Sequence, residues 1–239
     1  MKRALVTGGS GGIGAAICKR LAADGHHLIV HANRSLDKAV GVVAEIVAAG
    51  GSAEAVAFDV TDRAASAAAL EALLEGGAIQ ILVNNAGIHA DAVFPGMSGE
   101  QWDSVLDVSL NGFFNVTQPL TMPMIRTRWG RIITISSIAG ITGNRGQVNY
   151  SAAKGALHAA SKSLALELAS RNVTVNAVAP GIIATGMIEG AFDAETIKNL
   201  VPMKRAGKPE EVADLVAFLA SDKAAYISGQ IISINGGMI

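Results

Sequence analysis

The sequence predicts an α/β fold in which a doubly wound parallel sheet of about seven strands carries helices on both faces. Short aliphatic runs alternate with longer helical stretches along almost the whole chain. This alternation indicates parallel strands, because a tight hairpin cannot connect them and each helical stretch must cross over. The runs are apolar at consecutive positions, which is typical of strands buried on both faces. Half of the 239 residues are hydrophobic, which is ample for such a core.

The elements follow one another in a single series. The expected strands cover residues 4–7, 27–32, 54–60, 79–85, 131–136, 173–179 and 231–235. The expected helices cover residues 13–24, 37–49, 64–75, 100–126, 150–170 and 209–220. No linker or low-complexity tract interrupts the series, so we expect one domain over residues 1–239, with a cofactor half in about 1–130 and a catalytic and substrate half in about 131–239.

Composition argues against several classes of protein. A net charge of −1 provides no field that would attract nucleic acid or an anionic membrane. No apolar run is long enough to cross a bilayer, and no secretory signal precedes the first strand. His26, His27 and His31 flank the second strand without an acid or cysteine at ligand spacing, so we expect strand-edge packing and no metal site. The lone Cys18 cannot form an internal disulfide, which favours a cytoplasmic protein.

A glycine-rich segment, VTGGSGGIG (6–14), follows the first strand and opens the first helix. Glycines allow the backbone to approach a pyrophosphate, whose charge is met by the amides of the helix N-terminus. The alternative is an ordinary turn. The position at the start of an alternating chain favours a dinucleotide loop, with contacts from Thr7, Gly8, Ser10, Gly12, Ile13 and Gly14.

The end of the second strand indicates which dinucleotide binds. Enzymes that use NAD usually carry a carboxylate there, which binds the ribose 2′-hydroxyl. This chain has Asn33, Arg34 and Ser35, and the nearest acid, Asp37, is expected to belong to the next helix. An arginine can pair with a 2′-phosphate through two parallel hydrogen bonds. A merely solvated Arg34 is the alternative, but the missing acid favours NADP(H).

Tyr150 and Lys154 begin a predicted helix and lie one turn apart on the same face. A nearby ammonium favours the phenolate, so we expect Lys154 to lower the pKa of Tyr150 from its usual value of about 10. Ser137 ends the preceding strand, and its hydroxyl is suited to hold a substrate oxygen. Taken alone, such a pair is usually a cation lying along a ring on a helix surface. Ser137 and the glycine loop favour an acid–base site instead.

Six segments resemble the short-chain dehydrogenase/reductase family: TGGSGGIG, NNAG (84–87), ISS (135–137), YSAAK (150–154), NAVAPG (176–181) and INGG (234–237). The family has a Rossmann-type fold. Within it, GRIITISS, GNRGQVNYSAAK and VAFLASDKAAYISGQ are most similar to the 3-oxoacyl-[acyl-carrier-protein] reductases. The resemblance implies an oxidoreductase of fatty acid or polyketide-type synthesis, which uses NADP(H) to reduce a 3-oxoacyl thioester on acyl carrier protein. It also implies a homotetramer.

The resemblance implies a role for each site residue. Tyr150 would donate the proton, Ser137 would position the carbonyl, and Lys154 would hold the nicotinamide ribose while tuning the tyrosine. Further cofactor contacts would come from Asp59, Val60, Asn85, Ala86, Gly87, Pro180, Gly181, Ile183 and Thr185. Met187 and Met203 fall where the family has a mobile lid, and either touch substrate or only cover it.

The chain departs from the family in the helix after NNAG. The family has an asparagine where this chain has Ser109, and Asn111 two residues later should point elsewhere. The family asparagine sits at a helix distortion, where its carbonyl holds a water that relays protons to the lysine. Ser109 keeps that carbonyl, and a serine hydroxyl can help a helix bend. The alternative is a straight helix and a broken relay.

Arg128 and Arg171 match family positions that dock the acidic carrier protein, and we expect Arg126 and Arg131 to complete a surface patch. Scattered solvated arginines are the alternative. Two rival functions remain open: a reductase for a CoA thioester, small ketone, sugar or sterol, and a cofactor-binding sensor or scaffold that has lost the chemistry. Intact Ser137, Tyr150 and Lys154 count against the sensor, and Ser109 counts for it.

Overall fold

The computed structural model describes residues 1–185 and 193–239. These residues contain a seven-stranded sheet in the order β3-β2-β1-β4-β5-β6-β7, and its neighbouring strands are parallel. The strands are β1 (Arg3–Val6), β2 (His27–Ala32), β3 (Ser52–Ala57), β4 (Ile81–Asn84), β5 (Gly130–Ile135), β6 (Val173–Pro180) and β7 (Ile231–Ile234). The predicted fold class is confirmed.

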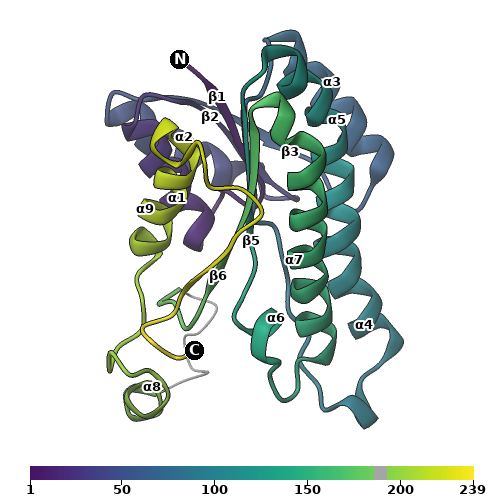
Figure 1. The fold of residues 1–239 in the computed structure, drawn as a ribbon, viewed down its shortest axis with the longest axis vertical. Coiled ribbons are helices and arrows are strands. Elements are labelled where there is room, and N and C mark those ends of the chain that lie inside the picture. The colour runs from purple at the N-terminus through teal and green to yellow at the C-terminus, as the bar shows by residue number, and fades with distance from the viewer. Residues whose placement is uncertain (186–192) are drawn as a thin grey trace.

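Helices cover both faces of the sheet, as Figure 1 shows, with α1, α2 and α9 on one face and α3, α5 and α7 on the other. Their bounds are α1 (Gly12–Ala23), α2 (Leu36–Ala48), α3 (Arg63–Glu75), α4 (Gly99–Leu106), α5 (Gly112–Thr127), α6 (Ala139–Thr142), α7 (Val148–Leu168), α8 (Ala194–Leu200) and α9 (Pro209–Ala220). The sequence does not predict the short α6 and α8. None of the described helices is long and apolar enough to span a lipid bilayer.

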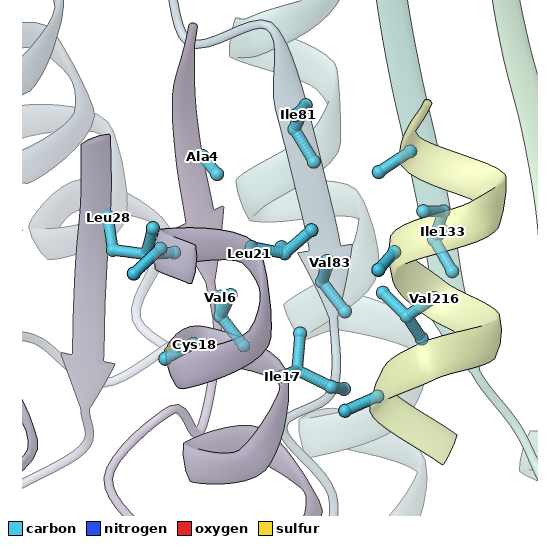
Figure 2. Packing of buried hydrophobic residues seen from close by; sticks show 14 of the residues in the cluster. Ala4, Val6, Ile17, Cys18, Leu21, Leu28, Ile81, Val83, Ile133 and Val216 are labelled. Carbon is cyan, nitrogen blue, oxygen red and sulfur yellow. The ribbon is translucent and has the colours of Figure 1, made fainter. Parts of the chain in front are cut away.

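Two apolar cores lie on the two faces of the sheet. Ala4, Leu5 and Val6 are all fully buried, and they alternate between the cores because successive side chains of a strand point in opposite directions. Figure 2 shows the first core, in which Ile17 of α1 and Val216 of α9 turn toward the sheet. This double burial explains why the strands appear in the sequence as unbroken aliphatic runs.

The helix predicted over residues 100–126 is interrupted. α4 begins at a capping box, in which Ser98 Oγ accepts from the Gln101 amide at 3.1 Å and Gln101 Oε1 accepts from the Ser98 amide at 2.9 Å. A π-helical turn (Asp107–Asn111) then separates α4 from α5. Turns of this kind are frequent at functional sites. The helix therefore opens around Ser109, and the straight helix is the alternative that fails.

Candidate active site

The glycine loop is tied to the segment after β4. Thr7 Oγ1 accepts from the amides of Asn85 at 2.9 Å and Ala86 at 3.0 Å. In return, the Asn85 side-chain amide donates to the carbonyls of Thr7 at 3.0 Å and Gly8 at 3.1 Å. The structure thus brings together four residues that the sequence predicts to contact the cofactor, from two strands that are neighbours in the sheet.

The loop meets the requirements of a pyrophosphate site. Gly8 has a φ of 62°, and a Cβ on Gly14 would lie 2.2 Å from the Gly8 carbonyl oxygen, so both positions need glycine. α1 begins at Gly12 with no side-chain cap and no acid in its first turn. The amides of its first turn, which include Ile13, lack intrahelical acceptors. They are therefore available to an anion, and partly exposed Ser10 lies beside them on the loop.

The end of β2 is open to solvent. Asn33, Arg34 and Ser35 are exposed, and Asp37 lies in the first turn of α2, as the sequence predicts. Hydrogen bonds from the Thr61 amide and hydroxyl, together with the Arg34 charge, hold the pKa of Asp59 below its usual value.

Arg34 and Asp59 therefore stand near each other beyond β2 and β3. The next residue, Val60, is buried, and its carbonyl accepts from the Asn115 side chain at 2.9 Å. This arrangement fits an adenosine whose 2′-phosphate lies beside Arg34.

Lys154 reaches the carboxyl edge of the sheet from inside α7. The side chain is buried, with 4% of the residue exposed, and Nζ donates to the Ile135 carbonyl at 2.9 Å. Burial lowers the Lys154 pKa to about 8. A Cβ on Gly87 would lie 3.3 Å from Nζ, so glycine leaves room for the ammonium. Nζ lies 5.5 Å from the centre of the Tyr150 ring.

Tyr150 lies close enough to Ser137, which follows β5, for the serine hydroxyl to act on its pKa. Burial raises the pKa of Tyr150, a hydrogen bond with the Ser137 hydroxyl opposes that rise, and the Asp91 charge adds to it. The sequence predicts a lowered pKa, and the structure gives the opposite direction. The raised pKa keeps the phenol protonated at neutral pH, which is the form that can donate a proton.

A small cavity of about 10 Å³ lies beneath the π-helical turn, lined in part by Asn84, Ser109, Thr134 and Ile135. Ser109 Oγ and Thr134 Oγ1 are both buried, and neither has a hydrogen-bond partner within the described residues. A space of this size holds roughly one water. The Ile135 carbonyl also accepts from Lys154, so the cavity adjoins the lysine. Asn111 points outward and bonds Asp107, as expected.

The segment after β6 closes the site from the other side. The Gly181 amide donates to the Ile234 carbonyl at 2.9 Å, and Ile183 forms an isolated bridge with Gly207. Thr185 faces the glycine loop, since its Cγ2 lies 3.7 Å from the position of a Cβ on Gly12. Pro180 is the buried end of β6. Met203 is exposed, whereas Met187 lies outside the described residues.

A larger hollow of about 390 Å³ opens between residues 182–183, 203–211 and 233–237. Its lining includes Arg205, Glu211 and Asn235, and none of Ser137, Tyr150 and Lys154. We place the chemistry at the tyrosine because its neighbours carry the proton-donating groups, whereas Arg205 and Glu211 are already paired with each other at 2.6 Å.

Two buried residues beside the site are missed by the sequence prediction. Asn149 is fully buried, its side-chain amide donates to the carbonyls of Ala90 at 3.0 Å and Gln101 at 2.8 Å, and its Oδ1 accepts from the Tyr150 amide. It fixes the start of α7 against two other segments. An asparagine immediately before the helical tyrosine is the signal that indicates it. His31, expected at a strand edge, is buried behind the glycine loop.

Arg128 and Arg171, the expected docking residues, lie near the amino ends of the strands, at the opposite edge of the sheet from Tyr150. Arg128 and Arg171 are exposed at the ends of α5 and of the turn after α7, and the neighbouring Asn172 side chain donates to the Arg128 carbonyl at 3.1 Å. Arg131 is only 1% exposed, so its predicted place in a surface patch is wrong. It stacks on Trp129 and pairs with Asp222 at 3.3 Å.

Known proteins are similar in sequence to this chain over nearly its whole length. Residues 2–196 match the short chain dehydrogenase family. The 3-oxoacyl-[acyl-carrier-protein] reductase FabG of Aggregatibacter actinomycetemcomitans is 46% identical over 236 residues, which is 98% of either chain. A 3-oxoacyl-[acyl-carrier-protein] reductase of Synechocystis sp. is 47% identical, and nodulation protein G of Rhizobium sp. (strain N33) is 46% identical, each over 99% of this chain and 96% of its own. This chain belongs to the short chain dehydrogenase family.

Proposed function

We propose that this protein is an NADP(H)-dependent reductase that converts a 3-oxoacyl thioester on acyl carrier protein to the 3-hydroxyacyl thioester, in fatty acid or polyketide-type synthesis. One observation carries the proposal: a half-buried, protonated Tyr150 lies close to Ser137, whose hydroxyl acts on its pKa, and stands one helical turn from a buried Lys154. The names of the relatives from Aggregatibacter and Synechocystis support the substrate class.

The glycine loop, the end of β2 and the segments after β3, β4 and β6 would hold the cofactor. When bound, the nicotinamide supplies a hydride to the carbonyl carbon. Ser137 donates a hydrogen bond to the carbonyl oxygen, and Tyr150 transfers its phenolic proton to that oxygen as the alcohol forms. Lys154 would hold the nicotinamide ribose, and its pKa of about 8 allows it to exchange a proton near neutral pH. Arg34 would select NADP(H) by pairing with the 2′-phosphate.

Ser109 belongs to the same machinery as a positioning residue. The π-helical turn and the cavity beneath it support a retained water relay toward Lys154, and count against the sensor that has lost the chemistry. The native serine is therefore compatible with full turnover.

The carrier protein would dock on Arg128 and Arg171, which gather positive charge on an exposed surface. Because these arginines lie at the edge of the sheet away from Tyr150, docking on one protomer would serve the active site of another. This requires an oligomer, for which we propose a homotetramer. We further propose that residues 1–239 act as one domain, in the cytoplasm.

The test compares substrates and cofactors in one assay of cofactor oxidation. We expect NADPH with acetoacetyl-[acyl carrier protein] to be used most efficiently, ahead of NADH, acetoacetyl-CoA and a simple ketone. Charge reversal at Arg128 and Arg171 should raise KM for the carrier-linked substrate and leave that for acetoacetyl-CoA unchanged. Failure to use any thioester would overturn the proposed substrate class, and equal losses on both thioesters would overturn the docking site.

A further inference from the structure

His31 lies behind the glycine loop and makes two specific hydrogen bonds. The Gly8 amide donates to Nδ1 at 3.1 Å, and Nε2 lies 2.9 Å from the Phe58 carbonyl oxygen. An amide can only donate and a carbonyl can only accept, so the imidazole is neutral and carries its proton on Nε2. The residue is 1% exposed, and its ring lies 4.2 Å from that of Phe58.

These two bonds join separate parts of the proposed cofactor site. Gly8 belongs to the loop that would hold the pyrophosphate, and Phe58 precedes Asp59 and Val60, which would contact the adenine. β2 lies between β1 and β3 in the sheet, so a side chain at its carboxyl end can touch both loops. The main chain adds to this link, because the Gly9 amide donates to the His31 carbonyl at 2.8 Å.

We propose that His31 is a positioning residue of the cofactor site, in which a neutral imidazole sets the spacing between the phosphate loop and the adenine loop. The inference rests on the proposed use of NADP(H). It goes beyond that function, because it assigns to one side chain the affinity of the site and the response of that affinity to acid.

Acid weakens the site for a geometric reason. A proton added to Nδ1 would face the Gly8 N–H, so two donors would meet and the bond to the loop would be lost. Burial lowers the pKa of His31, opposed by its bond to Phe58 and by the Asp59 charge, so the neutral form persists below the usual pH range.

The other titratable groups around the His31 ring do not account for the loss of cofactor affinity in acid. Asp59 stays ionised because its pKa is lowered, in part by the neighbouring Arg34. Cys18 packs beneath Gly9, and burial raises its pKa, so the thiol stays neutral. The affinity for NADP⁺ is therefore complete at neutral pH, and it falls where the pH drops through the lowered pKa of His31, below the ordinary histidine value of about 6.5.

Two substitutions separate the two bonds. His31→Asn keeps an acceptor near the position of Nδ1 and cannot titrate, whereas His31→Gln places its amide near Nε2 and leaves the part-buried Gly8 amide without an acceptor. His27→Asn is the matched control, because His27 lies at the other end of β2, where it bonds Ser52 at 2.7 Å and Glu54 at 3.2 Å.

The experiment is calorimetric titration of NADP⁺ into wild type and the three variants, from pH 8 down to the lowest pH at which thermal melting shows a folded protein. At pH 7.5 we expect His31→Asn and His27→Asn to bind within about threefold of wild type, and His31→Gln about tenfold more weakly, since an unsatisfied buried donor is costly. kcat at saturating NADPH should change by less than about twofold in every variant, because these substitutions alter the affinity for the cofactor and leave the activation barrier unchanged.

As the pH falls through the lowered pKa of His31, the affinity of wild type relative to His31→Asn should fall; this ratio cancels the titration of the ligand's own 2′-phosphate, near pH 6. Equal weakening in His31→Asn and His31→Gln, or a ratio that stays flat down to the lowest pH at which the protein is folded, would overturn the inference alone. If wild type fails to bind NADP⁺ at pH 7.5, the cofactor assignment itself is wrong.

Discussion

Where the strands end, at the carboxyl edge of the sheet, some buried polar groups have no hydrogen-bond partner among the described residues. Where the strands begin, at the amino edge, the cationic side chains are paired with carbonyls, carboxylates or an aromatic ring. The hydroxyls of Ser109 and Thr134 lack partners among the described residues, and α1 begins without a side-chain cap. At the amino edge, Arg3 donates to the Leu73 carbonyl at 2.6 Å, to the Gly77 carbonyl at 2.7 Å and to Glu54 at 2.9 Å.

A second group of paired side chains at the amino edge surrounds Trp129. Lys2 Nζ lies 3.6 Å and Arg131 Cζ 4.2 Å from the ring centre, and the indole N–H donates to Asp222 at 2.9 Å. Buried polar groups are normally paired, so unpaired ones call for an explanation. The polar groups of the amino edge therefore stabilise the fold, whereas those of the carboxyl edge are left free to bind a ligand.

The largest expected effect comes from Tyr150→Phe at the carboxyl edge. The substitution keeps the ring and removes the proton donor, so kcat should fall by roughly 10²–10⁴-fold. Steady-state kinetics with acetoacetyl thioester and NADPH measure this, and calorimetry should find NADP⁺ affinity unchanged. Turnover near that of wild type would show that another group supplies the proton.

Arg34→Ala should have the next largest effect, on affinity alone. Removal of a charge-assisted hydrogen bond costs about 1.5–3 kcal/mol, so NADPH should bind roughly 10–100-fold more weakly. The NADH affinity should stay unchanged, because NADH has no 2′-phosphate. If wild type binds the two cofactors equally well, Arg34 does not select between them.

Asp222→Ala tests the amino edge. It leaves the buried Arg131 guanidinium with fewer partners, so the free energy of unfolding should fall by about 1–3 kcal/mol, while kcat and KM stay unchanged. The Trp129 indole, followed by Lys2 and Arg131, lowers the pKa of Asp222, so this contribution should be present at neutral pH and lost only in strong acid. Denaturant unfolding measures the loss, and a matching fall in kcat would contradict the separation of the two edges.

Ser109→Asn should have the smallest effect. The π-helical turn and its cavity are already present with serine, so kcat should stay within about tenfold of wild type, a change of roughly 1.4 kcal/mol or less in the barrier. The single-turnover rates of Ser109→Asn and wild type should likewise differ by no more than about tenfold. A rise of several hundredfold on restoring asparagine would mean that the native relay is defective.

The sequence predicts the strands and the residues at their carboxyl ends well, because local patterns encode both. Doubly buried strands must be continuously aliphatic, and the loop at Gly8 must be glycine for conformational reasons. The π-helical turn (Asp107–Asn111) is not predictable in this way, because no residue type or spacing in residues 100–126 marks where a helix takes up one extra residue.

Burial by distant segments is also hidden from local patterns. Arg131 looks like a surface cation, and its burial depends on Trp129 and on Asp222 far along the chain. The direction of the Tyr150 pKa likewise depends on packing around α7, which outweighs the Ser137 hydrogen bond. His31 is polar and near a strand end, and only the fold brings Gly8 and Phe58 to its two nitrogens.

Isotope transfer tests the central claim most directly. NADPH that carries deuterium at both C4 positions is incubated with wild-type protein and acetoacetyl-[acyl carrier protein], and the product is analysed by mass spectrometry. We expect one deuterium at C3 of the 3-hydroxybutyryl group for each NADPH consumed, and a rate that falls by roughly 10²–10⁴-fold in Tyr150→Phe. A product without deuterium, or no NADPH consumption by the wild-type protein, would contradict it.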